Sequence, residues 1–229
     1  SYMGGIITNR IDSDGTYNSA YGLDGIFRIY GNDYLNVKWA QTFENELNNT
    51  PVSLDQARIN VDWQRRTLKG FGYNFVFARA GKNYNPGMGF ELREDYSQWD
   101  GQLLYGWMPG ETGKILRHQI YLEGFLAVKN PTGRTESSEL GPRWEFLLKS
   151  GHNGGIDFKY FYESVTDSFS FSDEADIVPG NYSFYGISGY YSTPSTRLFY
   201  VEGDFYGGSF YDGNRISVGI APYWNPSSL

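Results

Sequence analysis

The sequence predicts an all-β chain and, within that class, an antiparallel transmembrane β-barrel. Three observations predict it: apolar and polar residues alternate along most of the chain, the alternating stretches are long, and aromatic residues are abundant. Aromatic residues make up 18% of the 229 residues, with 20 Tyr, 16 Phe and 6 Trp. Because successive side chains of a strand point to opposite faces, alternation gives each stretch one apolar and one polar face.

The alternation marks the strands in order along the chain. Its clearest stretches are residues 35–43, 57–64, 143–149, 156–163, 199–206 and 216–220. We expect about thirteen strands of roughly 8–12 residues, close to the ~9–11 that cross a membrane at a tilt. Strands of globular proteins are usually shorter, about 5–6 residues. The strand length therefore favours a membrane barrel over a soluble sandwich.

Turn residues separate these stretches. Residues 31–33, 69–70 and 193–195 contain Gly, Asn or Pro and predict tight turns. Residues 47–56, 82–88 and 167–181 predict longer polar loops. Short turns at one end of the strands and longer loops at the other are typical of outer-membrane barrels. Glycines inside strands are expected where a strand bends or where an aromatic neighbour packs over the glycine.

Composition excludes several classes of function. The chain has no Cys, which excludes disulfides and thiolate metal sites. Its net charge is −7, and the 19 basic residues are scattered among 26 acidic ones, which argues against a nucleic-acid partner. No apolar run is long enough for a transmembrane helix. The first residues lack a signal peptide and the last ones read as a loop, so we expect one barrel domain over residues 1–229, truncated at both ends and part of a larger barrel.

The polar faces carry charges of both signs, which suits a barrel interior where opposite charges meet across strands. The side chains expected to face the lumen are Lys38, Arg58, Asp62, Arg66, Arg143, Glu145, Asp157 and Lys159. Trp suits the level at which hydrocarbon meets water, and the expected interface aromatics are Trp39, Trp63, Trp107 and Trp144. A soluble sandwich with a solvated polar face fits the same alternation.

The opening of the chain and one later segment resemble a known family. Residues 4–10 (GGIITNR) and 21–28 (YGLDGIFR) are similar to its "TNR" and "GxD" strands, and residues 85–93 (NPGMGFELR) resemble its "NPxxGFxxR" signature. The family is the Bacteroidetes-type outer-membrane barrel domain catalogued as domain of unknown function 5916. Its members often carry a preceding domain similar to family-nine carbohydrate-binding modules. The resemblance implies an outer-membrane barrel.

The signature has a structural interpretation. Asn85 and Pro86 open it, and Pro86 with the following glycine predicts a tight turn. Gly89 is expected where the backbone needs a conformation or a close approach that a side chain would block. Phe90 is expected to anchor on an apolar face, and Arg93 is expected to meet carboxylates on the polar side.

Residues with catalytic or metal-binding chemistry are few. Of the two histidines, His118 lies in an expected strand and His152 in an expected turn, neither beside a distinctive partner for Ser–His or Asp–His hydrolysis. Adjacent carboxylates such as 94–95 point to opposite faces of a strand and so do not form a glycosidase pair. The acidic residues at 167, 173, 174 and 176 lack the spacing of a calcium loop. We expect no catalytic residue, no metal and no cofactor.

These observations predict an integral protein of the bacterial outer membrane with a polar lumen. Its role would be passage, anchoring or scaffolding, with outer-membrane lipids and lipopolysaccharide around it. Other outer-membrane proteins or lipoproteins, and glycans, are further expected partners. One alternative is a secreted all-β carbohydrate-binding module, and a second is a hydrolase embedded in a barrel.

Overall fold

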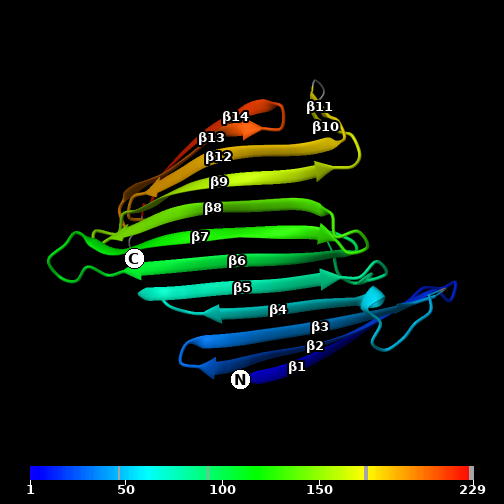
Figure 1. Cartoon of the computed structure of the whole chain (residues 1–229). Coiled ribbons are helices and arrows are strands. Elements are labelled where there is room, and N and C mark those ends of the chain that lie inside the picture. Colours follow the sequence, from blue (N-terminus) through cyan, green and yellow to red (C-terminus); the bar gives the residue numbers. More distant parts are fainter. Residues whose placement is uncertain (46, 92, 173–174, 227–229) are drawn as a thin grey trace. The chain divides into compact units, whose positions relative to one another are not determined.

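The computed structural model describes residues 1–45, 47–91, 93–172 and 175–226 (Figure 1). Strands account for 69% of the chain, which confirms the all-β prediction. The helical content of the described residues is one 3-10 turn, η1 (Leu54–Gln56). No helix in the described part of the chain has the length and apolar character needed to cross a membrane.

Twelve strands form one antiparallel sheet, and each pairs with its neighbours in chain order. In that order they are β1 (Tyr2–Ile11), β2 (Tyr17–Tyr30), β3 (Asp33–Glu44), β4 (Ala57–Arg65), β5 (Gly70–Ala80), β6 (Tyr96–Trp107), β7 (Ile115–Lys129), β8 (Thr135–Leu148), β9 (Asn153–Val165), β12 (Gly180–Ser192), β13 (Phe199–Phe210) and β14 (Gly213–Trp224). Within the described residues β1 and β14 end the order, so the sheet is not closed into a barrel.

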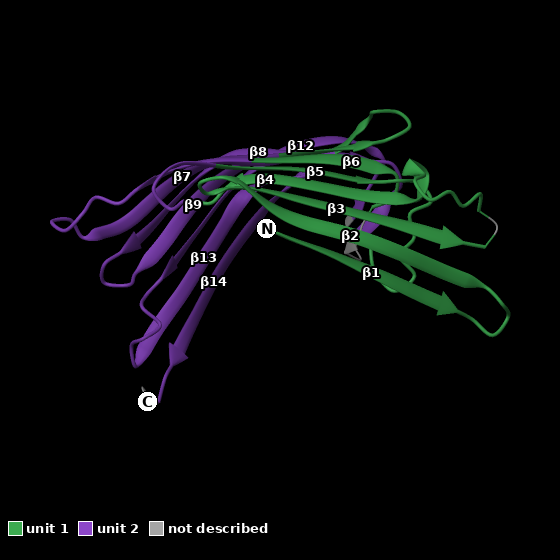
Figure 2. Ribbon diagram, turned by 90° about the horizontal axis from the view of Figure 1, so that it is seen from below, with its two compact units in different colours: residues 1–66, 73–101, 125–136 green, residues 67–72, 102–124, 137–229 purple. Residues whose placement is uncertain are grey.

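The chain divides into two compact units, coloured green and purple in Figure 2. Unit 1 comprises residues 1–66, 73–101 and 125–136, and unit 2 comprises residues 67–72, 102–124 and 137–229. The boundary runs through β5, β6, β7 and β8 rather than through a linker. The prediction of a single domain over residues 1–229 stays a prediction.

The predicted turns lie where the strands end. Gly31 has a φ of +53°, which suits a glycine, and residues 31–32 join β2 to β3. The predicted loop at residues 167–181 is wrong in part, because it contains the short hairpin β10 (Phe169–Ser172) and β11 (Ala175–Ile177). The polar composition of this segment hid the hairpin. The structure thus has fourteen strands in its described residues, against about thirteen expected from the pattern.

The best-buried side chains of unit 1 are small or polar. Ala57, Ala80 and Ala127 are fully buried, and so are Gln41 and Thr42. The Gln41 amide donates to the carbonyl of Ser53 at 3.2 Å, and the Thr42 hydroxyl donates to the carbonyl of Gln56 at 3.3 Å. The core of unit 1 therefore lies at the strand ends near the β3–β4 connection. Side chain–backbone hydrogen bonds satisfy the Gln41 N–H and the Thr42 hydroxyl, whereas Gln41 Oε1 is buried without a hydrogen-bond partner among the described residues.

The apolar faces of the strands are exposed in both units. On β14 of unit 2, Ile216, Val218 and Ile220 are 83%, 71% and 74% exposed. On β4 and β5 of unit 1, Trp63 and Phe75 are 48% and 43% exposed. These side chains alternate with polar ones, as predicted. Within each unit, the described residues therefore provide no second layer over the apolar face.

Candidate functional site

Strand register gathers polar side chains on one face of unit 2. Antiparallel pairing places Arg143 of β8, Asp157 of β9, Ser188 of β12, Tyr206 of β13 and Ser217 of β14 in one row. Residues directly opposite one another in paired strands project to the same face. Five strands therefore present one continuous polar row.

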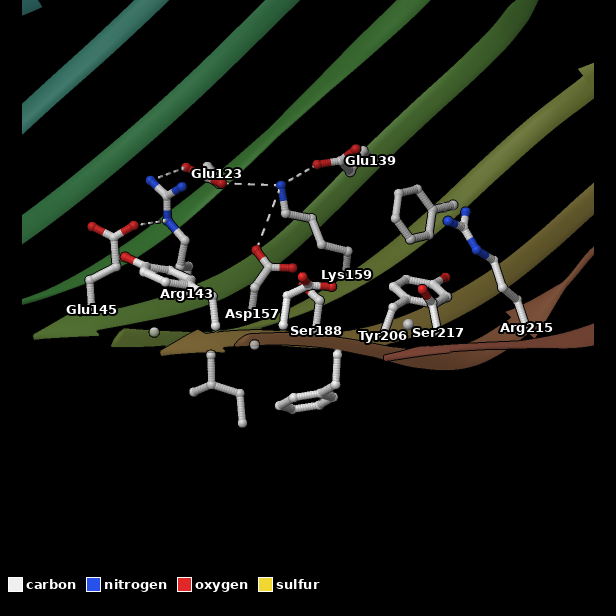
Figure 3. Close-up of a pocket in the computed structure, with 18 residues that line it drawn as sticks. Glu123, Glu139, Arg143, Glu145, Asp157, Lys159, Ser188, Tyr206, Arg215 and Ser217 are labelled. Carbon is white, nitrogen blue, oxygen red and sulfur yellow. Dashed lines mark hydrogen bonds and ion pairs between the residues drawn. The ribbon is translucent and has the colours of Figure 1, made fainter. Parts of the chain in front are cut away.

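Lys159 is the centre of a charged cluster on this face (Figure 3). Its ammonium group forms an ion pair with Glu139, lies 3.1 Å from Glu123 Oε1, and lies 3.8 Å from Asp157 Oδ2. The Lys159 side chain is only 18% exposed, so these carboxylates replace much of the water that would solvate its charge. The cluster ties β7, β8 and β9 together on their polar face.

Arg143 extends the cluster to a second cation. It lies 3.1 Å from Glu123 Oε2 through Nη2, and its Nε lies 3.4 Å from Glu145 Oε1, an ion-pair contact without hydrogen-bond geometry. The guanidinium also lies over the Tyr121 ring, 4.4 Å from its centroid. Glu123 thus bridges Arg143 and Lys159, and it accepts a further hydrogen bond of 2.7 Å from Gln102. Four carboxylates surround two cations, which leaves an excess of negative charge.

A glycine allows the strands of the cluster to approach closely. A Cβ placed on Gly141 would lie 1.8 Å from the carbonyl oxygen of Phe158, closer than real atoms come. Elsewhere in unit 2, aromatic rings pack over glycines: a Cβ on Gly189 would meet the Phe205 ring at 2.5 Å. The aromatic cover is the use of in-strand glycine expected from the sequence, whereas the close backbone approach at Gly141 is a further use that was not predicted.

The four residues of unit 2 predicted to face the lumen, Arg143, Glu145, Asp157 and Lys159, all belong to this cluster. Glu139 also belongs to it and was not among the predicted residues. Glu139 has the same phase on β8 as Arg143 and Glu145, so extending their alternation by two positions would have found it.

The four predicted residues of unit 1 lie in separate contacts rather than in one cluster. Arg58 donates to Glu91 at 2.5 Å, and Asp62 accepts from Asn36 at 2.7 Å. Arg66 lies over the Tyr34 ring at 4.5 Å, and Lys38 is exposed beside Asp24 in the register of β2 and β3. Unit 1 therefore carries a polar face without the dense ion pairing of unit 2.

The signature loop of unit 1 is held by Asn18. The Asn18 amide donates to the carbonyl of Asn85 at 2.9 Å, and its oxygen accepts from the Gly87 N–H at 3.0 Å. A Cβ on Gly89, where a close approach was expected, would lie 3.2 Å from the Pro86 side chain, and the closer approach is at Gly87, where a Cβ would lie 2.6 Å from the Asn18 side chain. Burial in this loop raises the pKa of Tyr84.

Other signature residues follow the expectation in part. The Gly89 N–H donates to the carbonyl of Pro86 at 2.7 Å, which closes the predicted turn. Arg93 lies 4.0 Å from Glu136, on the carboxylate side as expected. Phe90 is 82% exposed, so within the described residues it does not pack on an apolar face as predicted.

The predicted interface tryptophans lie on the strands among other rings. Trp63 meets Tyr73 edge-on at 5.0 Å, Trp107 stacks on His118 at 5.1 Å, and Trp144 lies 5.2 Å from Phe146. Trp39 lies opposite Leu23 and Ile59 in the neighbouring strands. An aromatic ring therefore lies beside three of the four side chains, each of which stays partly exposed.

Neither histidine is placed beside a Ser or Asp by a described contact. His118 stacks on Trp107, and His152 Nδ1 lies 2.7 Å from the hydroxyl of Tyr191. Over the described residues, no group of three His, Asp or Glu side chains is arranged to hold a metal ion. Asp173 and Glu174, considered for a calcium loop, lie outside the described residues.

No protein-family model, curated protein or solved structure matches this chain. The family resemblance of the signature segments therefore stays a prediction.

Proposed function

We propose that this chain is the wall of an integral outer-membrane β-barrel, with its apolar face toward lipid and its polar face toward the lumen. One observation carries the proposal: the apolar side chains of the strands are exposed, whereas the charged side chains of unit 2 are ion-paired and partly buried. A soluble sheet has the opposite arrangement, because its apolar face is buried in a core.

The cost of leaving this apolar face in water supports a lipid environment. Large contiguous apolar patches are rare on soluble monomers and mark contact with a membrane or another protein. Ile216, Val218 and Ile220 form an unbroken apolar row along β14, and rows of the same phase occur on β9 and β7. Burying such side chains in hydrocarbon stabilises each by about 1.5–3 kcal/mol relative to water.

The connections between strands also support a barrel. Residues 31–32, 66–69 and 149–152 are short connections, whereas residues 81–95 and 166–179 are long ones. The long connections of unit 1 follow β3 and β5 and so leave the strands at the same end. In unit 2 the long connection after β9 and the two-residue connection after β13 leave the strands at the same end, so the alternation of short turns and long loops typical of outer-membrane barrels is followed in part.

In this proposal the partners are outer-membrane lipids and lipopolysaccharide on the apolar face. Other outer-membrane proteins or lipoproteins would contact the loops or the ends of the sheet. The role is passage, anchoring or scaffolding at the outer membrane, without catalysis. The family resemblance supports the same location and remains part of the proposal.

Fractionation of bacterial envelopes tests the proposal. The full-length protein should remain in the outer-membrane pellet after carbonate or urea washes. It should also migrate faster on a gel before heating than after, as folded barrels do. Release into the soluble fraction would contradict the membrane proposal and favour a secreted all-β carbohydrate-binding module.

A further inference from the structure

A trough lies beside the charged cluster, on the polar face of unit 2. Strand register places Lys159, Gly186, Gly208 and Arg215 in one row across β9, β12, β13 and β14. The Tyr206 side chain lies over Gly186, where a Cβ would be 2.5 Å from its hydroxyl oxygen, so this ring forms part of the wall between the two cations. The cavity has a volume of about 530 Å³, within the ~300–1,000 Å³ of small-molecule sites.

Two charged groups of this trough have no ion pair or hydrogen bond among the described residues. Arg215 lies over the Tyr206 ring at 5.0 Å, and no carboxylate pairs with it among the residues that the structure describes. In Figure 3 its side chain lies beside Tyr206 and Ser217, apart from the ion pairs around Lys159. A free guanidinium offers five N–H donors that are not satisfied by the protein.

Asp204 supplies the matching acceptor. It lines the same cavity, and no hydrogen bond or ion pair to it occurs within the described part of the chain. Its carboxylate lies over Gly219, where a Cβ would be 2.3 Å from Asp204 Oδ1. A glycine at this position therefore keeps the carboxylate open to the cavity.

The charge of the cavity narrows the class of ligand. Its lining includes five carboxylates and three cations, Lys159, Arg143 and Arg215. The excess negative charge disfavours an anion, and a simple cation would leave the donors of Arg215 unused. A hydroxyl group both donates and accepts, so a hydroxyl-rich ligand can use Arg215, Asp204 and the lining serines together.

The spacing of the two groups calls for an elongated ligand. Asp204 lies opposite Gly219, four residues along β14 from Arg215. Four residues of a strand span about 14 Å, more than one small polar group can bridge. We propose that this trough binds a neutral oligosaccharide, with Arg215 and Asp204 as hydrogen-bonding residues at its two ends. The proposal deepens the proposed function by naming a ligand for the polar face.

Calorimetric titration of the full chain in detergent micelles tests this inference. The probes are maltohexaose, cellohexaose and chitohexaose, with a galacturonic acid hexamer and hexalysine as charged counterparts. At least one neutral probe should bind saturably, and Arg215→Ala and Asp204→Ala should each weaken that binding about tenfold, as expected for hydrogen bonds to charged groups. The exposed residues Asp212 and Arg10 provide controls, and Asp212→Ala and Arg10→Ala should leave it unchanged.

A variant that fills the trough with a large side chain separates loss of binding from loss of folding. Ser217→Trp lies on the exposed end strand and should abolish binding without loss of heat-modifiable migration. Binding of a charged probe alone, no binding of the three neutral probes, or binding insensitive to Arg215 and Asp204 would overturn the inference. The outcome of this titration is separate from that of envelope fractionation. If the protein stays in the membrane but binds no sugar, the oligosaccharide site is wrong and the proposed outer-membrane location still stands.

Discussion

Phe158 and Lys159 are neighbours on β9 and point to opposite faces of the strand. The phenyl ring is 45% exposed, whereas the side chain of the lysine is 18% exposed and held by carboxylates. A soluble protein would bury the ring and solvate the ammonium group. The same inversion holds along β14, where Ile216, Val218 and Ile220 are exposed.

The polar face of unit 2 holds its ion pairs, whereas the side chains of the apolar face meet one another through ring contacts such as Trp144 with Phe146. Ion pairs and hydrogen bonds depend on defined partners, whereas an apolar face in lipid needs only to remain apolar. Substitutions on the two faces should therefore fail for different reasons. A charged side chain introduced on the apolar face should lower the stability of the folded protein. On the polar face, removal of an ion-pair partner should lower it.

The largest effect is expected for a charge placed on the apolar face. Phe158→Arg should destabilise the folded protein in lipid vesicles by about 2–4 kcal/mol, because lipid does not solvate the guanidinium. Ser188→Arg, on the opposite face, should change stability by less than about 0.5 kcal/mol. Urea titrations followed by the heat-modifiable band measure both. Equal tolerance of the two arginines would contradict the assignment of faces.

Removal of the central cation should have the next largest effect. Lys159→Met removes the ion-pair partner of Glu139 and Asp157 and leaves Glu123 with Arg143 alone, and should cost about 2–3 kcal/mol. Adding Glu139→Gln should restore part of the loss, because it removes one of the repelling charges. Lys69→Met in an exposed turn is the control. Urea unfolding of the parent protein, the two single variants and the double variant measures these effects. Equal stability of Lys159→Met and Lys69→Met would refute the role of the cluster.

A methyl group added where β8 and β9 approach closely should destabilise the folded protein somewhat less than the loss of Lys159. Gly141→Ala would press a Cβ against the Phe158 carbonyl and should cost about 1–3 kcal/mol through strand displacement. Gly207→Ala is the matched control, because nothing lies within 4 Å of the Cβ it would add. Unfolding midpoints of the two variants should differ clearly. Indistinguishable midpoints would show that the approach is not needed.

The smallest effect is expected at the signature loop of unit 1. Asn18→Ala removes the hydrogen bonds to Asn85 and Gly87 and should cost about 1–2 kcal/mol. Because these hydrogen bonds hold only the loop, residues 82–91 should become more sensitive to protease while the strands stay folded. Asn214→Ala, on an exposed strand, should behave as the parent protein. Unchanged cleavage of the loop in Asn18→Ala would contradict its role as an anchor.

Strands and faces could be predicted from the sequence because alternation is a local property. The predicted stretch at residues 156–163 lies within β9, and its polar residues Asp157 and Lys159 share a face as expected. Contacts across strands could not be predicted, because they depend on register. Glu123 meets Arg143 and Lys159 only once β7, β8 and β9 are aligned.

The loops show the same limit. The Asn18 side chain accepts a hydrogen bond from the N–H of Gly87, which is 69 positions away in the sequence, and no local pattern indicates that contact. The β10–β11 hairpin was hidden by polar residues between two long strands. Exposure of Phe90 likewise depends on how the turn at Pro86 is placed, which hydrophobicity alone does not show.

The most direct test of the two faces uses the absence of cysteine from the chain. Ile187→Cys and Ser188→Cys place a single thiol at neighbouring positions of β12, on opposite faces. Each is labelled with an environment-sensitive fluorophore in a protein reconstituted into vesicles. The label at 187 should be quenched by nitroxide lipids and the label at 188 by aqueous iodide. Quenching of both labels by iodide alone, or the reverse pattern, would contradict a lipid-facing apolar surface.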